Sequence, residues 1–227
     1  RSEAIEIERF MNNESCKRRI VIMGAAGRDF HNFNMLYRSD PSTRVLAFTS
    51  TQIPGISGRS YPPELAGAHY PDGIPIIDEN ELEALCRREN IDQVDFAYSD
   101  VANEQVMHAA SCIMNAGASF HLAGPRQTEL RAKIPVIAIC AVRTGCGKSQ
   151  TAHYLSRYLA EKGLRVSAIR HPMPYGDLSR QTVQRFATRA DLDEADCTIE
   201  EREEYEPYVA NGSVIFAGVD YAAIVAK

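Results

Sequence analysis

Short apolar runs alternate with amphipathic stretches through the first half of the chain. The apolar runs lie at residues 19–23, 44–49, 74–77, 94–99 and 119–124. Stretches between them, such as ENELEALCRREN and ANEQVMHAASCIMNAG, have the spacing of helices with one apolar face. Short strands that alternate with helices are typical of βαβ units around a parallel sheet. We therefore predict an α/β fold, with a Rossmann-like domain over residues 19–125 that follows an N-terminal extension over residues 1–18.

A second alternating pattern begins after a polar connector over residues 126–133. The run IPVIAICAV (134–142) has the composition of a strand that is buried on both faces. Residues 148–162 have a helical period, and Gly163 is a stop signal. The remaining predicted elements are strands at 165–170 and 213–218 and a helix that Asp220 caps. A second α/β domain is therefore expected over residues 134–227.

The composition is that of an ordinary globular protein. Of 227 residues, 44% are hydrophobic and 24% are charged, and the net charge of -5 gives no sign of nucleic acid as a partner. The six cysteines show no metal-ligand spacing, which favours free thiols in a reducing cytoplasm. No apolar run approaches the roughly 20 residues that span a bilayer, so we expect no membrane partner. The acidic segment over residues 191–207 forms either solvated helix faces or a mobile lid.

The segment AVRTGCGKSQ (141–150) places a glycine turn between the predicted buried strand and the predicted helix. Val142 stands where the pattern GxxxxGK[ST] has its first glycine, so the loop fits a variant whose glycines crowd beside the lysine. Strand, turn and helix in this order indicate a phosphate-binding loop. Lys148 would reach the β and γ phosphates of ATP or GTP, and the Ser149 hydroxyl would bind Mg²⁺. The predicted nucleotide-binding residues are Thr144, Gly145, Cys146, Gly147, Lys148, Ser149 and Gln150.

Similar loops occur in dethiobiotin synthetase and in MinD-type ATPases. We therefore interpret residues 134–227 as the N-terminal part of a P-loop NTPase domain of this class. Arg143 stands five places before the lysine and is a catalytic candidate together with Lys148. It either acts on a γ phosphate across a homodimer or faces solvent. Cys146 lies inside the turn, where any small side chain is accepted, and it is not proposed as a nucleophile.

Other basic residues are candidates for binding a small anionic substrate. Arg170 and His171 follow the strand predicted at 165–170, and ligands of open α/β sheets bind beyond the carboxyl ends of strands. The alternative for Arg170 is a pair with the acidic segment over 191–207. In the loop MGAAGRDFHNFN (23–34), Phe30 stands where a dinucleotide fingerprint has its third glycine, so NAD is not expected. Weaker substrate candidates are Arg28, His31 and Asn32 in this loop, and Arg59 in the connection over 51–67.

Seven strings, taken in order, resemble the cyclic 2,3-diphosphoglycerate synthetase family, whose members are often labelled GTPases. The strings are GAAGRDFHNFN, FTSTQIPGISGRSYPPELAG, FAYSDV, AVRTGCGKSQT, IRHPMPYGDL, QRFAT and CTIEEREEYEP. The resemblance covers about residues 19–223. It implies an enzyme that uses ATP and Mg²⁺ to close 2,3-bisphosphoglycerate, a small phosphorylated anion, into a cyclic phosphoanhydride. Lys148 and the loop amides would then serve the nucleotide, and Arg170 and His171 the substrate.

The resemblance also implies a longer protein, because members of the family are about twice this length. The Walker B strand and the residues that recognise the base are then expected beyond residue 227, and this piece is expected to be inactive by itself. Two other functions stay open. One is a GTPase of the same loop class that acts in metallocentre or cofactor assembly, and the other is a non-catalytic sensor of a small anion or nucleotide.

Overall fold

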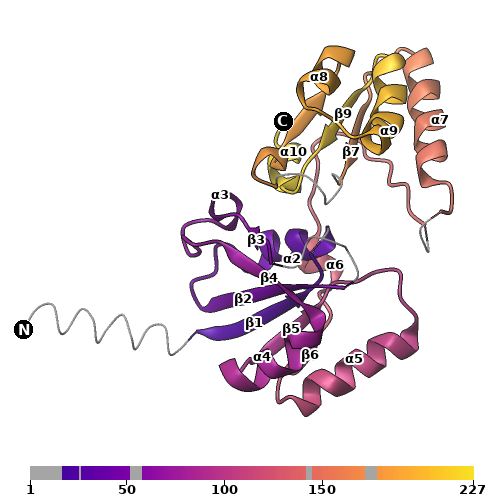
Figure 1. Ribbon diagram of the computed structural model, residues 1–227. Coiled ribbons are helices and arrows are strands. Elements are labelled where there is room, and N and C mark those ends of the chain that lie inside the picture. The colour runs from indigo at the N-terminus through magenta and orange to yellow at the C-terminus, as the bar shows by residue number, and fades with distance from the viewer. Residues whose placement is uncertain (1–16, 26, 52–57, 142–144, 172–177) are drawn as a thin grey trace, which may run out of the picture. The chain divides into compact units, whose positions relative to one another are not determined.

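The computed structural model describes residues 17–25, 27–51, 58–141, 145–171 and 178–227. The chain divides into two units, Arg1–Glu129 (unit 1) and Leu130–Lys227 (unit 2), and each is described by itself (Figure 1). Within the described ranges, every helix is too short or too polar to cross a lipid bilayer.

Unit 1 is built on a six-stranded sheet with the order β3-β4-β2-β1-β5-β6. Its strands are β1 (Arg18–Met23), β2 (Thr43–Ser50), β3 (Ser60–Tyr61), β4 (Ile74–Asp78), β5 (Gln93–Phe96) and β6 (Ser119–His121). β1 pairs in parallel with β2 and β5, and β4 and β6 extend the parallel sheet on either side. β3 pairs with β4 in the antiparallel direction. The predicted α/β fold with a Rossmann-like sheet is confirmed for this unit.

Helices cover both faces of this sheet (Figure 1). They are α2 (Arg28–Leu36), α3 (Pro63–Ala66), α4 (Leu82–Glu89), α5 (Asn103–Asn115) and α6 (Pro125–Thr128). On the α2 face, Phe30 packs against Phe48 and Tyr61, with ring centroids 5.0 and 4.7 Å apart. On the α4 and α5 face, Val21 and Val94 form a buried cluster with residues of those helices. Burial on both faces explains why the strands read as short apolar runs.

Unit 2 contains a three-stranded sheet with the order β7-β9-β8. Its strands are β7 (Ser167–Arg170), β8 (Gln184–Phe186) and β9 (Val214–Ala217), and its helices are α7 (Lys148–Glu161), α8 (Arg189–Glu194), α9 (Ile199–Ala210) and α10 (Tyr221–Val225). β7 and β9 are parallel, and β8 and β9 are antiparallel. Asp220 caps α10 as predicted, because its Oδ1 accepts a hydrogen bond from the Ala223 amide at 3.0 Å.

The acidic segment over residues 191–207 contributes to two helices, α8 and α9, which agrees with the first of the two interpretations given above, solvated helix faces. α9 begins with a capping box, in which Thr198 Oγ1 accepts from the Glu201 amide and Glu201 Oε2 accepts from the Thr198 amide. Tyr205 and Tyr208 are buried on the inner face of α9. The acidic side chains of the segment, except that of Asp196 between α8 and α9, therefore belong to helices that pack onto the unit 2 sheet.

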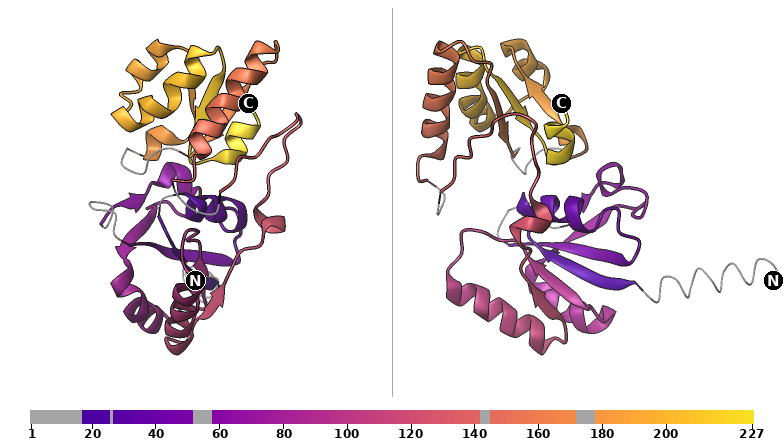
Figure 2. Two further views of the ribbon diagram at one scale, coloured as in Figure 1. Left: turned by 90° about the vertical axis from the view of Figure 1, so that its right-hand side faces the viewer. Right: turned by 180° about the vertical axis from the view of Figure 1, so that it is seen from behind.

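The strand predicted over residues 134–142 is wrong for its described part, residues 134–141. This segment has no regular secondary structure, and its path between α6 and α7 is irregular in both views of Figure 2. Ile134 is 69% exposed and Val136 is 70% exposed. A strand needs a neighbouring strand to pair its amides and carbonyls, and no described strand pairs with this segment. The P-loop NTPase domain predicted from it is therefore not shown.

Candidate phosphate-binding site

Two glycines shape the turn that precedes α7. Gly145 has φ +80° and Gly147 has φ +81°, so both lie in the left-handed region that glycine adopts without steric cost. Gly147 is the N-cap of α7, and the helical residue Lys148 follows it directly. A left-handed residue next to a right-handed one turns successive amides toward one side, which is the backbone pattern of an anion nest. The described part of the predicted loop thus has suitable local geometry for a phosphate.

The N-terminus of α7 adds to this geometry. Gly147 provides no side-chain cap for the first amides of the helix, and the first turn carries no acidic residue. Thr151 closes the turn, since its amide and its hydroxyl both donate to the Gly147 carbonyl, at 3.1 and 3.0 Å. The 14 residues of α7 give the helix a dipole whose positive end lies at this turn. Helix and turn can therefore act together on one anion.

The side chains of the turn are accessible to a ligand. Gly145, Cys146, Lys148 and Gln150 are exposed, and Ser149 is half-buried. Their roles in binding nucleotide and Mg²⁺ stay predictions. Arg143, Thr144 and Val142, which the sequence also placed in the loop, lie outside the described residues.

Contacts with α9 hold α7 in place. His153 Nε2 lies 3.0 Å from the Glu204 carbonyl oxygen, and the His153 ring packs edge-on against Tyr208. Burial, with a smaller contribution from the nearby charge of Arg170, lowers the pKa of His153 below its ordinary value. Ser156 is buried, and its hydroxyl lies 2.9 Å from that of Ser213. These contacts attach the middle of α7 to the rest of unit 2.

The structure gives Arg170 an acidic partner inside unit 2. Arg170 ends β7, and its Nη1 forms an ion pair with Glu204 of α9. This is the alternative that the sequence raised, a basic strand end paired with the acidic segment. The ring of His171 lies edge-on to that of Tyr221, with centroids 6.2 Å apart. Residues 172–177, which follow His171 in the chain, lie outside the described residues.

In unit 1, an aspartate fills the glycine turn after β1. Asp29 Oδ1 accepts hydrogen bonds from the amides of Gly27 and Phe30, at 2.8 and 2.7 Å. A Cβ atom at Gly24, where φ is +122°, would lie 2.5 Å from Asp29 Oδ2. The side chain of Asp29 is 5% exposed. Amides of the kind that bind phosphate in dinucleotide folds are thus satisfied here by a carboxylate of the chain itself.

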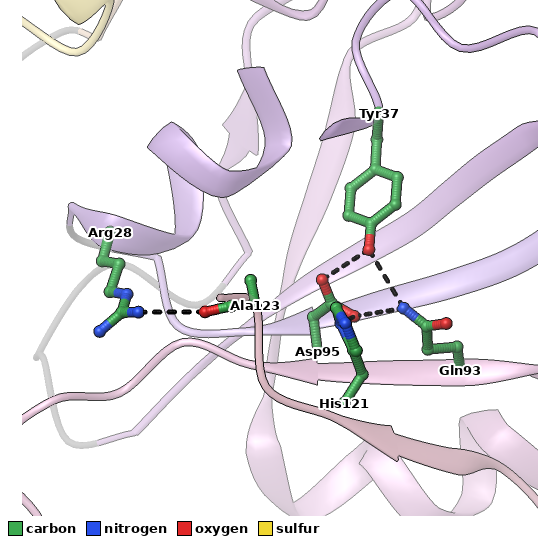
Figure 3. Close-up of polar contacts among 6 residues, drawn as sticks. All are labelled: Arg28, Tyr37, Gln93, Asp95, His121 and Ala123. Carbon is green, nitrogen blue, oxygen red and sulfur yellow. Dashed lines mark hydrogen bonds and ion pairs between the residues drawn. The ribbon is translucent and has the colours of Figure 1, made fainter. Parts of the chain in front are cut away.

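The candidate substrate residues of unit 1 contact the protein backbone. Arg28 Nη2 donates to the Ala123 carbonyl at 3.4 Å (Figure 3), and His31 Nε2 lies 2.7 Å from the Thr128 carbonyl oxygen. Both contacts join α2 to the segment around α6. Asn32 is buried, and no described residue donates a hydrogen bond to its Oδ1. Arg59 is half-buried, and its carbonyl accepts from the Ile76 amide at 2.8 Å.

Unit 1 also contains a buried polar cluster that the sequence did not predict (Figure 3). Asp95 of β5 is 0% exposed. Its Oδ2 accepts from the Tyr37 hydroxyl at 2.6 Å, and its Oδ1 accepts from Gln93 Nε2 at 2.6 Å and lies 2.9 Å from His121 Nδ1. Burial and, to a smaller extent, the hydrogen bond to Asp95 raise the pKa of Tyr37. The cluster joins the end of α2 to β5 and β6.

A sequence signal for this cluster exists in the run VDFAYS, where Asp95 interrupts a strand expected to be buried on both faces. A buried carboxylate needs hydrogen-bond donors. The donors themselves could not be identified from the sequence, because they come from α2, from β5 and from β6.

Comparison with known proteins places the chain near an arginine synthetase. It is 59% identical over 212 residues to arginine synthetase ArcE from Thermococcus kodakarensis, a match that covers 93% of this chain and 47% of the relative. The chain thus spans about half the length of the curated relative that it matches. No protein-family model matches the chain.

Solved structures give weak likeness only. UDP-D-quinovosamine 4-dehydrogenase from Vibrio fischeri is 18% identical, with a TM-score of 0.38, and the match covers 48% of this chain and 79% of that one. The Rex-family repressor RSP is 14% identical, also with a TM-score of 0.38, and the match covers 70% of this chain and 68% of the repressor chain. These scores carry no argument about this protein.

The relative's name corrects the function implied by the seven strings. A protein that is 59% identical to this chain is named for arginine synthesis. Neither the formation of cyclic 2,3-diphosphoglycerate nor a GTPase function fits that name. The assignment to the cyclic 2,3-diphosphoglycerate synthetase family is therefore wrong. Short strings that proteins of one fold share do not determine the substrate.

Proposed function

We propose that this chain is the nucleotide-binding part of an ATP-dependent synthetase that forms arginine. The observation that carries the proposal is the exposed turn with left-handed Gly145 and Gly147 at the uncapped N-terminus of α7. The name of the relative, arginine synthetase, supports an enzyme and supplies the product.

The chemistry of arginine formation explains why such a loop is needed. The guanidinium carbon of arginine bears three nitrogen atoms, and the last carbon–nitrogen bond to form displaces an oxygen. That oxygen is a poor leaving group until ATP transfers its γ-phosphoryl group to it and ADP is released. The carbon–oxygen bond then breaks as the nitrogen attacks, the oxygen leaves as phosphate, and the nitrogen loses a proton. Phosphoryl transfer depends on positioning and on positive charge around the phosphates rather than on covalent catalysis by the protein.

The residues of the turn can supply both the positive charge and the positioning that phosphoryl transfer needs. The Lys148 ammonium would offset charge on the β and γ phosphates, and the turn amides with the α7 dipole would orient them. The Ser149 hydroxyl would be a ligand of Mg²⁺, which bridges phosphate oxygens when it is bound. Arg170 is not included, because its guanidinium pairs with Glu204.

Nucleotide binding is tested by calorimetric titration of the 227-residue chain with ATP and with GTP, each with Mg²⁺. Lys148→Ala should weaken the binding of ATP by about tenfold to a hundredfold, because a charge-assisted hydrogen bond contributes about 1.5–3 kcal/mol. Lys162→Ala is the matched control, since it removes the same side chain at the other end of α7. Equal affinity of the chain and the Lys148→Ala variant would refute the nucleotide site.

Arginine formation is tested separately, in the reverse direction. An enzyme catalyses its reaction both ways, so arginine should support ATP formation from ADP and phosphate, with release of ammonia. The assay uses this chain together with the polypeptide that corresponds to the rest of the relative, and lysine replaces arginine as the control substrate. ATP binding without arginine-dependent ATP formation would reject the arginine assignment and leave the nucleotide site intact.

A further inference from the structure

Most of the exposed large apolar side chains of unit 2 lie between residues 134 and 169, and Ile199 of α9 lies outside this part of the chain. We call Ile134, Val136, Ile137, Tyr154, Leu164 and Ile169 the exposed apolar set, and their exposed fractions lie between 49% and 70%. They belong to the segment before the phosphate turn, to α7, to the α7–β7 connection and to β7. Single exposed apolar residues are common on protein surfaces, but a set of this size indicates a surface that another polypeptide covers.

β7 is the part of this set with an open hydrogen-bonding edge. Among the described strands, β7 pairs only with β9, so its other edge has no strand beside it. No residue of β7 is buried, whereas Ile215 and Ala217 of the neighbouring β9 are 0% exposed. Parallel strands are normally covered on both faces, and natural proteins protect open edges with charge, proline or a covering element. β7 instead presents Ile169, which is 49% exposed.

Residues 134–141 also need a neighbouring strand, because their backbone amides and carbonyls are not paired with a described strand. In the chain they precede α7 and β7, so the three segments have the order of a right-handed crossover unit. Such a unit puts its first and last segments in one sheet, parallel to each other, either side by side or with a strand between them. The segment and β7 do not pair with each other. A single strand inserted between them would satisfy the open edge of β7 and give residues 134–141 a partner.

We propose that this position is occupied by a β-strand from polypeptide corresponding to the part of arginine synthetase ArcE outside the matched region. The matched 212 residues are 47% of that relative, so more than half of its length is available to supply the strand. The inserted strand pairs with β7 on one side and with residues 134–141 on the other, and its apolar side chains cover Ile137 and Ile169. The proposal does not depend on which reaction the protein catalyses.

Insertion of the strand also acts on the phosphate turn. Residues 134–141 precede the turn that carries Gly145 and Gly147, and pairing them with a strand restrains the chain ahead of that turn. Strand docking that stabilises this segment should then favour nucleotide binding, and linkage requires nucleotide binding to favour strand docking to the same extent.

The test is co-expression of the 227-residue chain with the Thermococcus kodakarensis polypeptide outside the matched 212 residues. Complex formation is measured by co-purification and by peptide-resolved hydrogen exchange. Amide exchange in residues 134–141 and 167–170 should slow by about tenfold or more in the complex. Ile137→Asp should prevent the complex, because it places a charge in the covered surface. Met107→Asp is the matched control, since Met107 is 63% exposed on α5 of unit 1.

Several results would overturn the proposal. Failure of the two polypeptides to co-purify would reject the docking surface. A complex that forms as well with the Ile137→Asp variant as with the Met107→Asp variant would also reject it. Protection of residues 134–141 in the chain alone would mean that the chain itself covers them. A concentration-dependent dimer of this chain that Ile137→Asp abolishes would assign the surface to a second copy instead.

Discussion

Replacement of Tyr37 by phenylalanine tests the energetics of the buried cluster in unit 1. Tyr37 is 4% exposed, and its hydroxyl donates at 2.6 Å to Asp95, which is 0% exposed. The substitution keeps the ring and removes one oxygen, so it deletes a hydrogen bond to a carboxylate, worth about 1.5–3 kcal/mol. It also deletes the weaker hydrogen bond that the hydroxyl accepts from Gln93 Nε2 at 3.1 Å. Gln93 and His121 remain beside Asp95. We therefore expect unit 1 to lose about 2 kcal/mol of unfolding free energy near pH 7.

The same substitution should change how unit 1 responds to alkali. Burial and the Asp95 hydrogen bond raise the pKa of Tyr37 above its value in the unfolded chain, which is about 10. Below pH 10 both states hold the phenol proton, and the stabilisation is complete. Above pH 10 the unfolded state releases the proton while the folded state keeps it, so stability falls by about 1.4 kcal/mol per pH unit. The Tyr37→Phe variant lacks this part of the loss.

The two units require an assay that separates them, because a chain of two units has no single unfolding free energy. Hydrogen exchange of the β5 amides reports the opening of unit 1 near pH 7. Urea titrations at pH 8 and pH 10.5, followed by alkylation of the buried Cys86 of unit 1 and mass spectrometry, then give the alkaline slope for this unit. Tyr154→Phe is the matched control, since Tyr154 is 61% exposed and should change neither quantity. A loss below about 0.5 kcal/mol, or an unchanged alkaline slope, would refute the reasoning.

Three further predictions concern other parts of the chain. Gly24→Ala should destabilise unit 1 by about 2 kcal/mol or more in the same exchange assay, because the new Cβ would meet Asp29 Oδ2 at 2.5 Å. Thr198→Ala should cost unit 2 about 1 kcal/mol and Thr198→Ser much less, since serine keeps the cap of α9. Burial raises the pKa of Cys197 to about 11, so iodoacetamide at pH 8 should label the exposed Cys146 well before Cys197, as mass spectrometry would detect. Equal labelling rates would contradict that order.

Five of the six strands of unit 1 could be predicted, because burial on both faces leaves a direct mark on composition; the two-residue β3 lies in the segment over 51–67 that was expected to be a connection. The runs at 19–23 and 44–49 became β1 and β2 with bounds that differ by one residue at each end or less. The turn before α7 was also recognisable, because glycine adopts the conformations seen at Gly145 and Gly147 without steric cost, whereas its role in binding phosphate stays a prediction. In each case a local physical requirement selects the residue type.

Features that depend on distant partners could not be predicted in the same way. Residues 134–141 have the composition of a strand, but composition does not provide the neighbour that strand pairing needs. The contact of Asp95 with His121 depends on the register of β5 and β6, in which these two residues are opposite each other. The pairing of Arg170 with Glu204 likewise requires α9 to lie against the end of β7, which no local pattern specifies.

Asp29 makes the glycine turn of unit 1 independent of anions in solution. Its carboxylate is tethered one and two residues from the amides that it accepts from, so its effective concentration is fixed by the chain and does not vary with solute levels. The turn should stay ordered in buffers with and without phosphate. In unit 2, by contrast, the proposed function leaves the corresponding anion to be supplied from solution. One chain would then hold two versions of a backbone anion cradle, one permanently filled and one able to report whether nucleotide is present.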